Sequence, residues 1–128
     1  MKYIVCSDFE SVLIPETWVS IAEKTGINEL KLTTRDISDF DELMEHRLKY
    51  INQNNLNLKE LQDYISTEEP FEGSVNFVNW IQEKTQFFIL SGIFNEFAIP
   101  FLEKLNSPKI FCNQLTINEN GAITGYEI

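Results

Sequence analysis

Two acidic side chains separated by one residue follow the first apolar run of the chain. Asp8 and Glu10 come directly after residues 2–7, a β-branched and apolar stretch that reads as a strand. A carboxylate held at the end of a buried strand can act as a covalent nucleophile, and a second one beside it can serve as general acid or base. Acidic residues after strands are also common in ordinary loops, so the spacing alone leaves a plain structural reading open.

A second candidate is the Ser91-Gly92 pair, which follows another apolar run at residues 86–90. We expect the pair to form the turn into a helix that begins at Phe94, so that the Ser91 hydroxyl and backbone N–H groups face an oxyanion at the positive helix end. The alternative is that Ser91 is only an N-cap and Gly92 only a turn residue. Because parallel strands end at one edge of a sheet, the two loops are expected to converge on one pocket.

The segment between these two strands reads as helical. Apolar residues recur at helical spacing over residues 16–25, and Gly26 supplies a left-handed stop. Ser38 with Asp41 three residues later resembles a capping box that opens a longer helix. A third helix follows, so residues 16–69 are predicted to form a helical cluster.

Helices and strands alternate in the rest of the chain. The pattern predicts a helix over residues 74–84, the strand 86–90, a helix over 94–105 and a strand over 109–112. Asn120-Gly121 between alternating apolar residues predicts a hairpin. This order, with a helical insertion after the first strand, indicates an α/β fold with a parallel sheet, right-handed crossovers and a C-terminal β-hairpin.

Length and composition narrow the classes of partner. The 128 residues fit one domain, and 43% apolar and 12% aromatic residues suffice for a core. Ten basic against twenty acidic residues give a net charge of −10, which argues against nucleic acid as a partner. No apolar run approaches the ~20 residues of a bilayer span, so no membrane segment is expected.

Cys6 and Cys112 lie in apolar stretches and are expected to be buried thiols, which favours a cytoplasmic location.

The segments around both loops resemble known motifs. Residues 8–11 (DFES) and 88–94 (FILSGIF), with a helical insertion between them, resemble motifs one and two of the haloacid dehalogenase (HAD) superfamily, and within it the phosphoserine phosphatases. Two segments of the insertion resemble the cap of bifunctional phosphoserine phosphatase and homoserine phosphotransferase enzymes, namely TTRDI at 33–37 and LMEHRL at 43–48.

The resemblance covers the whole chain and implies its domain organisation. Residues 1–15 and 70–128 would form part of a HAD-like (Rossmannoid) three-layer core. Residues 16–69 would form a helical cap over that core.

The resemblance also implies roles for the loop residues. Asp8 would attack the phosphorus to form an aspartyl-phosphate, and Glu10 would protonate the leaving serine oxygen and then activate water. Ser91 and Gly92 would hold the phosphoryl oxygens. Mg²⁺ would be bound by Asp8 and by the backbone carbonyl of Glu10. Such a hydrolase releases serine from phosphoserine, a step of serine biosynthesis.

The helical cap would bind the rest of a small phosphorylated amino acid. By the resemblance, Glu16 would grip the substrate amino group, Phe40 would cover it, and Arg47 would pair with its carboxylate, a task that suits a planar guanidinium. Taken alone, Glu16 is a first-turn acid favoured by the helix dipole, and Arg47 is a solvated helix charge. Gly92 matches the plain phosphatases, whereas the bifunctional relatives carry Asp there, so hydrolysis is favoured over phosphotransfer.

Two further motifs of the family, a lysine that neutralises the phosphate and a Gly-Asp-rich loop with a metal-binding acid, are not found before Ile128. With Asp8 as its only carboxylate ligand, Mg²⁺ would be held weakly. We therefore expect impaired hydrolysis by this chain alone. The alternative is a catalytically inactive truncated or split member that acts as a binding or oligomerising module.

The first strand would also lie at an edge of the sheet. An apolar edge strand has open backbone groups that invite pairing. We therefore expect either a homodimer joined there or a complementing C-terminal polypeptide.

Overall fold

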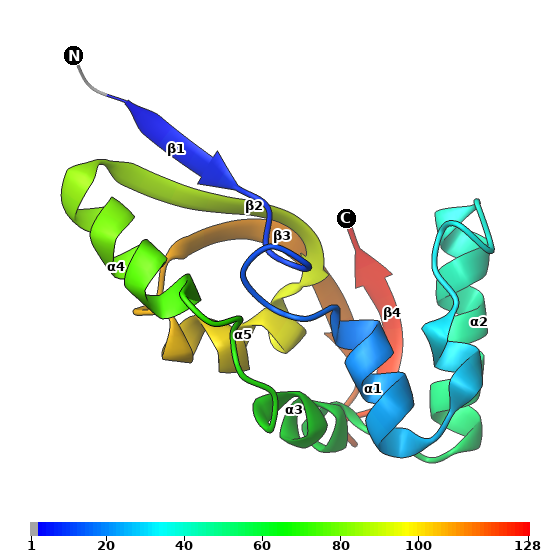
Figure 1. Ribbon diagram of the computed structural model, residues 1–128. Coiled ribbons are helices and arrows are strands. Elements are labelled where there is room, and N and C mark those ends of the chain that lie inside the picture. The colour runs from blue at the N-terminus through cyan, green and yellow to red at the C-terminus, as the bar shows by residue number, and fades with distance from the viewer. Residues whose placement is uncertain (1–2) are drawn as a thin grey trace.

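A four-stranded sheet in the order β1-β2-β3-β4 is the centre of the fold, in a computed structural model that describes residues 3–128 (Figure 1). The first three strands are parallel and the fourth is antiparallel to the third. Their bounds are β1 (Ile4–Ser7), β2 (Gln86–Phe94), β3 (Lys109–Ile117) and β4 (Ile123–Glu127). The predicted parallel sheet with a C-terminal hairpin is confirmed, while the predicted strand start at Lys2 lies outside the described residues.

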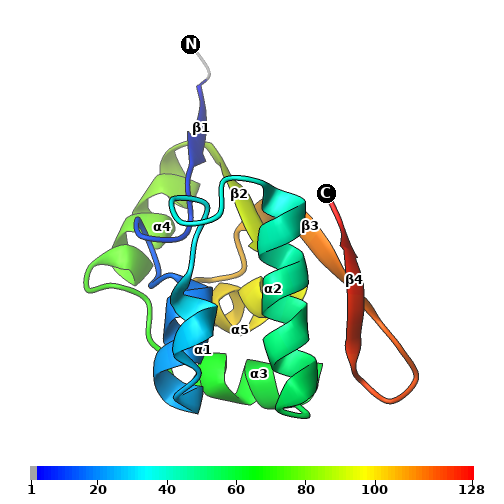
Figure 2. The ribbon, with the colours of Figure 1, turned by 90° about the vertical axis from the view of Figure 1, so that its right-hand side faces the viewer.

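Helices fill the long connection between β1 and β2 and the short one between β2 and β3. A brief 3-10 helix, η1 (Asn28–Lys31), lies between the first two α-helices. The α-helices of the described residues are α1 (Thr17–Thr25), α2 (Phe40–Gln53), α3 (Leu58–Ser66), α4 (Ser74–Lys84) and α5 (Asn95–Lys104). Figure 2 shows α1 and α2 side by side, with α3 near the lower end of both. We call residues 16–69 the helical insertion.

One face of the sheet is covered by helices and the other is open. In Figure 1, α4 and α5 lie on the same side of the sheet. Phe87 and Ile89 of β2 point to that side and are buried, because alternate residues of a strand face opposite ways. On the other face Leu90 is 50% and Phe111 is 55% exposed. The layer that would cover this second face is not formed by residues 3–128.

The open face also changes the reading of the cysteines. Cys6 of β1 is exposed, so its predicted burial is wrong, and Cys112 of β3 is only partly buried. Cys6 pairs in register with Phe88, whose strand partner Lys109 places its Nζ 5.9 Å from the Phe88 ring centroid. A thiol in an apolar strand is buried only where something covers that strand face.

The predicted turn at Ser91 and Gly92 is wrong, because β2 continues through both residues to Phe94. The pairing of β2 with β3 shifts between Leu90 and Phe94, which marks an irregular stretch inside the strand. The side-chain amide of Asn113 on β3 donates to the Gly92 carbonyl at 3.1 Å. This cross-strand bond supports an extended backbone where the sequence suggested a break.

The cap of α2 also differs from its prediction. The Asp39 side chain, and not that of Ser38, accepts the hydrogen bond of a first-turn backbone N–H, from Glu42 at 3.1 Å. Asp39 stands three residues before its partner, which is the spacing an N-cap needs. The other predicted helix signals hold, with Gly26 left-handed at the end of α1.

Hydrogen bonds join the C-terminal end of the helical insertion to α5. The Lys104 Nζ of α5 donates to the backbone carbonyls of Ser66 at 2.9 Å and Glu68 at 2.7 Å.

Within residues 3–128 no helix is both long and apolar enough to span a bilayer.

Candidate active site

A cavity of about 310 Å³ lies between the helical insertion and the end of β2. It brings together five of the predicted site residues: Glu10, Glu16, Phe40, Arg47 and Gly92. The other lining residues are Thr17, Trp18, Val19, Thr33, Thr34, Leu43, Ile93 and Phe94. The cavity thus joins the loop after β1, the helices of the insertion and the irregular end of β2, as the predicted convergence requires.

Glu10 is held at the N-terminus of α1. One of its carboxylate oxygens accepts hydrogen bonds from the Thr17 backbone N–H at 2.8 Å and from the Thr17 hydroxyl at 2.9 Å. Burial raises the pKa of Glu10, and the nearby Glu16 charge adds to this, while the Thr17 bonds and Arg47 act in the opposite direction. A carboxyl group with a raised pKa suits proton transfer to and from a reacting oxygen.

Arg47 is a buried cation, only 7% exposed, on the cavity side of α2. Its guanidinium carbon lies 4.6 Å from the ring centroid of Trp18, and one terminal nitrogen donates to the Leu32 carbonyl at 3.3 Å. Its Nε atom is buried without a hydrogen-bond partner. Burial lowers the pKa of Arg47 to about 10, which leaves the group charged at neutral pH. The reading of Arg47 as a solvated helix charge is therefore wrong.

Glu16 and Phe40 complete the polar and apolar parts of the cavity. Glu16 is exposed at the N-cap position of α1, where its side chain makes no capping bond and instead accepts from the Ser11 hydroxyl at 3.1 Å. Ser11 adopts a left-handed backbone with φ of 65°. Phe40 is the first residue of α2. A cation, two carboxylates and an aromatic wall therefore share one space.

Asp8, directly after β1, and Ser91, within β2, do not line the cavity. Asp8 follows β1 directly, one residue beyond the last paired position of Ser7 with Ile89, and its exposed carboxylate accepts from the Phe9 N–H at 2.8 Å. The Ser91 hydroxyl accepts from the Ile93 N–H at 3.1 Å. Ser91 lies inside β2 and not in a turn after it, so only Asp8 has the predicted placement directly after a strand.

The donors available to a divalent metal ion are few. Asp8 offers a carboxylate and Glu10 a backbone carbonyl, and oxygen ligands of both kinds suit Mg²⁺. Across residues 3–128 no group of three or more His, Cys, Asp or Glu side chains is placed to hold a metal ion. The two donors fit the chemistry of Mg²⁺ but supply only part of its octahedral shell.

Two of the lining residues that were not predicted as site residues contact predicted ones. Thr17 binds Glu10 across the loop between β1 and α1, and Trp18 carries the Arg47 guanidinium on its ring. Trp18 reads in the sequence as a packing residue on an apolar stripe. Neither contact follows from helical spacing, because each joins residues of different elements.

Comparison with known proteins adds sequence relatives. No family model matches the chain. The chain is 45% identical to the phosphoserine phosphatase ThrH of Pseudomonas aeruginosa over 125 residues, which cover 98% of the chain and 61% of that protein. It is 44% identical over 125 residues to a phosphoserine phosphatase of Pseudomonas syringae pv. tomato, covering 98% of the chain and 53% of the relative. The chain therefore spans less than two thirds of these relatives.

Solved structures share the fold. A phospho-aspartyl intermediate analogue of phosphoserine phosphatase superposes with a TM-score of 0.74 at 23% identity, covering 98% of the chain and 63% of that structure. A HAD family hydrolase from Salmonella enterica serovar Typhi superposes with a TM-score of 0.72 at 18% identity, covering 94% of the chain and 43% of that structure. Over the length that it spans, the chain is similar in sequence to these two phosphoserine phosphatases, and it shares its fold with solved phosphoserine phosphatase and HAD hydrolase structures.

Proposed function

We propose that this chain carries the nucleophile and the substrate cavity of a magnesium-dependent phosphoserine phosphatase. The observation that carries the proposal is the buried Arg47 guanidinium, with its unpaired Nε, in a cavity that also holds Glu10 and Glu16. A buried cation favours a carboxylate ligand, and nearby carboxylates favour an ammonium group. Phosphoserine carries both groups, and the relatives at 45% and 44% identity are named phosphoserine phosphatases.

The proposed reaction has two steps. The Asp8 carboxylate attacks phosphorus, the bond from phosphorus to the serine oxygen breaks, and Glu10 gives its proton to that oxygen. Glu10 then takes a proton from water, which attacks the aspartyl-phosphate, releases phosphate and frees Asp8. Ser91 and Gly92 hold the phosphoryl oxygens. Asp8 and the Glu10 carbonyl would hold Mg²⁺, which would supply positive charge against the phosphoryl group.

The helical insertion is proposed to act as a cap over a core of residues 1–15 and 70–128. Arg47 and Phe40 reach the cavity from α2, and Glu16 reaches it from the start of α1. In this arrangement Arg47 pairs with the substrate carboxylate, Glu16 binds its amino group and Phe40 covers it. The cap thus selects the amino acid part of the substrate, while the strand ends handle the phosphate.

A second candidate function is that of a module that binds substrate but needs another polypeptide for catalysis. Among the described residues, no lysine lines the cavity, and Arg47 is its one guanidinium beside Glu10 and Glu16. A phosphate dianion next to these carboxylates and Asp8 is repelled unless further cations balance it. This charge pattern favours slow turnover or none by the chain alone.

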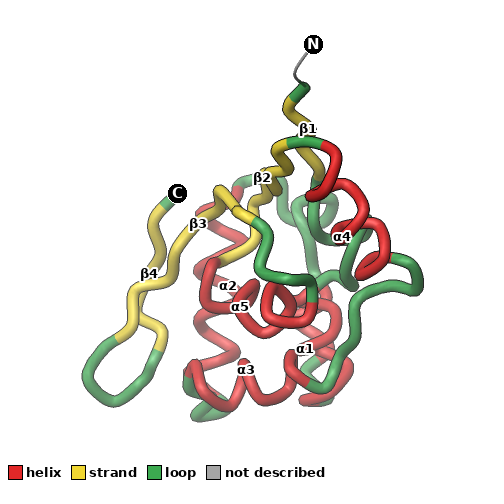
Figure 3. The backbone as a smooth tube through the Cα atoms, turned by 90° about the vertical axis from the view of Figure 1, so that its left-hand side faces the viewer, coloured by secondary structure: helices red, strands yellow, loops and turns green. Residues whose placement is uncertain are grey.

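The exposed sheet edge and face support an association of this kind. Strand β1 is at one edge of the sheet, and Figure 3 shows it at the opposite edge from the β3–β4 hairpin. Ile4 of β1 is 63% exposed, on the open face with Leu90 and Phe111. We propose that β1 pairs with a second copy of the chain or with a complementing C-terminal polypeptide, in the cytoplasm.

Phosphate release from phosphoserine in the presence of Mg²⁺ tests the proposal. We expect slow release by the wild-type chain that is abolished by chelation and by Asp8→Asn. Calorimetric binding of phosphoserine, with Arg47→Met against the exposed Arg35→Met as control, tests the cavity separately. Binding without release beyond the Asp8→Asn level supports the second candidate, and the absence of both refutes the proposed function.

A further inference from the structure

Tyr126 lies outside the cavity but contacts two residues of its wall. Its ring centroid is 5.6 Å from that of Phe40, with the rings at 89°, and 6.1 Å from that of Phe94. Both phenylalanines line the cavity, Phe40 at the start of α2 and Phe94 at the end of β2. One side chain of β4 therefore touches a wall supplied by the helical insertion and a wall supplied by the sheet.

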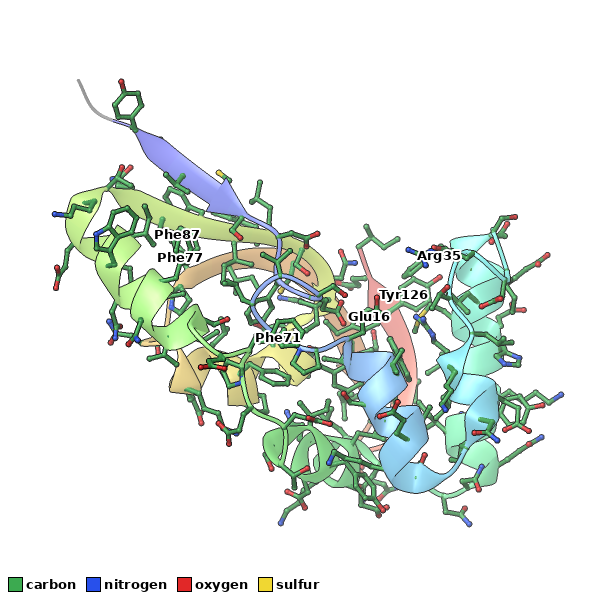
Figure 4. The ribbon with its side chains drawn as sticks, in the orientation of Figure 1. Glu16, Arg35, Phe71, Phe77, Phe87 and Tyr126 are labelled. Carbon is green, nitrogen blue, oxygen red and sulfur yellow. The ribbon has the colours of Figure 1, made fainter. Side chains whose placement is uncertain are left out.

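The hydroxyl of Tyr126 makes a further contact with the insertion. It donates a hydrogen bond to the carboxylate of Asp41, in the first turn of α2. Figure 4 shows Tyr126 between β4 and α2. The backbone behind it is well supported, because Tyr126 pairs in register with the buried Leu115 of β3. The ring and the hydroxyl of Tyr126 thus both contact the N-terminal turn of α2, while strand pairing holds the Tyr126 backbone in place.

Tyr126 is also linked through aromatic contacts to Trp18 of α1, another residue that lines the cavity. Phe94 packs edge-on against Phe97 with centroids 6.1 Å apart, and Phe97 packs edge-on against Trp18 at 5.3 Å. The ring of Trp18 carries the Arg47 guanidinium. Edge-to-face pairs favour one geometry over others, so these contacts favour one position of β4 relative to the lining residues Phe94 and Trp18.

We propose that Tyr126 is a positioning residue that holds the start of α2 against β4 and thereby keeps Phe40 closed over the cavity. It acts through Phe40 and Asp41 and does not touch the ligand. The inference rests on the proposed function only in treating the cavity as the substrate site. Loss of the Tyr126 contacts is expected to open the cavity without altering the residues that react.

A cysteine introduced at a buried position of the cavity wall reports opening of the cavity without any substrate. Leu43 lines the cavity and is 1% exposed, so Leu43→Cys in a Cys6→Ser, Cys112→Ser background is labelled by a thiol reagent only when the wall opens. The labelling rate then follows the population of the open state. A second reporter needs no change in the wall, because in a Trp80→Phe background the acrylamide quenching of Trp18 fluorescence also reports access to the cavity.

Tyr126→Phe and Asp41→Ala each remove the same hydrogen bond and are expected to raise the labelling rate roughly twofold to tenfold, which corresponds to the loss of one typical hydrogen bond at an exposed site. The double variant should exceed neither single variant by much, since one contact is lost in all three. Tyr126→Ala also removes the ring contacts and should open the cavity further. Tyr50→Phe is the control, because Tyr50 lies on α2, as Asp41 does, but packs edge-on against His46.

Global unfolding is measured by urea in the same variants, since a purely structural role would raise labelling only in proportion to it. Labelling and quenching that stay unchanged, or that rise only with global unfolding, overturn the proposal. The proposed function fails separately. If the cavity opens in Tyr126→Phe while phosphoserine binding is absent in the wild-type chain, Tyr126 positions the wall but the cavity is not the phosphoserine site.

Discussion

Arg47 is the residue whose surroundings differ most from what its sequence position suggests. It lies on a helix with acidic and basic neighbours, which is typical of a solvated charge, yet the folded chain buries it against Trp18. The protein retains a desolvated cation whose Nε has no partner. A buried charge without full pairing weakens a fold, so we infer that Arg47 lies in the cavity to bind a ligand.

Replacing this cation should therefore stabilise the chain while removing ligand binding. We expect Arg47→Met to raise the free energy of unfolding by about 1 kcal/mol, because the apolar side chain fills similar space without the desolvation cost. Urea unfolding measures the change. Arg35→Met, at an exposed site of the same insertion, should stay within about 0.5 kcal/mol of wild type. A clear loss of stability in Arg47→Met would show that its stacking on Trp18 outweighs the burial of its charge.

The titration of Tyr126 offers a test at high pH. Its hydrogen bond to Asp41, with the nearby Asp39 and Glu45 charges, raises the pKa of Tyr126 to about 12. The bond favours the neutral phenol, so its contribution is complete below the usual tyrosine pKa of about 10 and is lost as the pH rises through 12. Tyrosinate absorbance should show one late-titrating group that disappears in Tyr126→Phe and moves toward 10 in Asp41→Ala. An unchanged titration in Asp41→Ala would contradict this contact.

At the scale of elements, local signals predicted most helices well. Gly26 ends α1 in a left-handed conformation and Asn57 caps α3, since each signal acts within a few residues. The course of β2 through Ser91 and Gly92 could not be predicted, because the bond that supports it comes from Asn113 on another strand. Contacts between elements, such as that of Thr17 with Glu10, escape prediction for the same reason.

The cap of α2 gives a direct comparison of two neighbouring residues. Asp39→Ala removes the side chain that accepts from the Glu42 N–H and should lower the free energy of unfolding by about 1 kcal/mol. Ser38→Ala, one position earlier, should change it by less than about 0.5 kcal/mol. Urea unfolding of both variants decides between the two caps. A larger loss for Ser38→Ala would restore the capping box that the sequence suggested.

At the scale of the whole molecule, the edge position of β1 was expected, while the exposure of Cys6 was not. The same apolar alternation predicts a buried strand face whether or not a covering layer is present. Burial is thus decided by what lies opposite the strand, and the sequence of the strand itself carries no sign of it. Leu90 and Phe111 are about half exposed on that face, where a covering layer would bury their apolar side chains.

Self-association of the chain follows from this surface. We expect sedimentation to show a dimer that Ile4→Lys disrupts, because a charge on an edge strand opposes strand pairing. Ile99→Lys is a matched control, since Ile99 of α5 is 40% exposed away from β1. A wild-type chain that sediments as a monomer at all concentrations would leave only the complementing polypeptide as partner. Equal disruption by both variants would place the contact elsewhere.

The most direct measurement of the central claim is the trapping of a phosphorylated chain. The wild-type chain and Glu10→Gln are mixed with phosphoserine and Mg²⁺, quenched in acid and examined by peptide mass spectrometry. The account predicts phosphate on Asp8 of the wild-type chain, formed and lost more slowly in Glu10→Gln because both steps need Glu10, and none in Asp8→Asn. Phosphate on another residue, or equal labelling in Asp8→Asn, would contradict the assignment of Asp8 as the nucleophile.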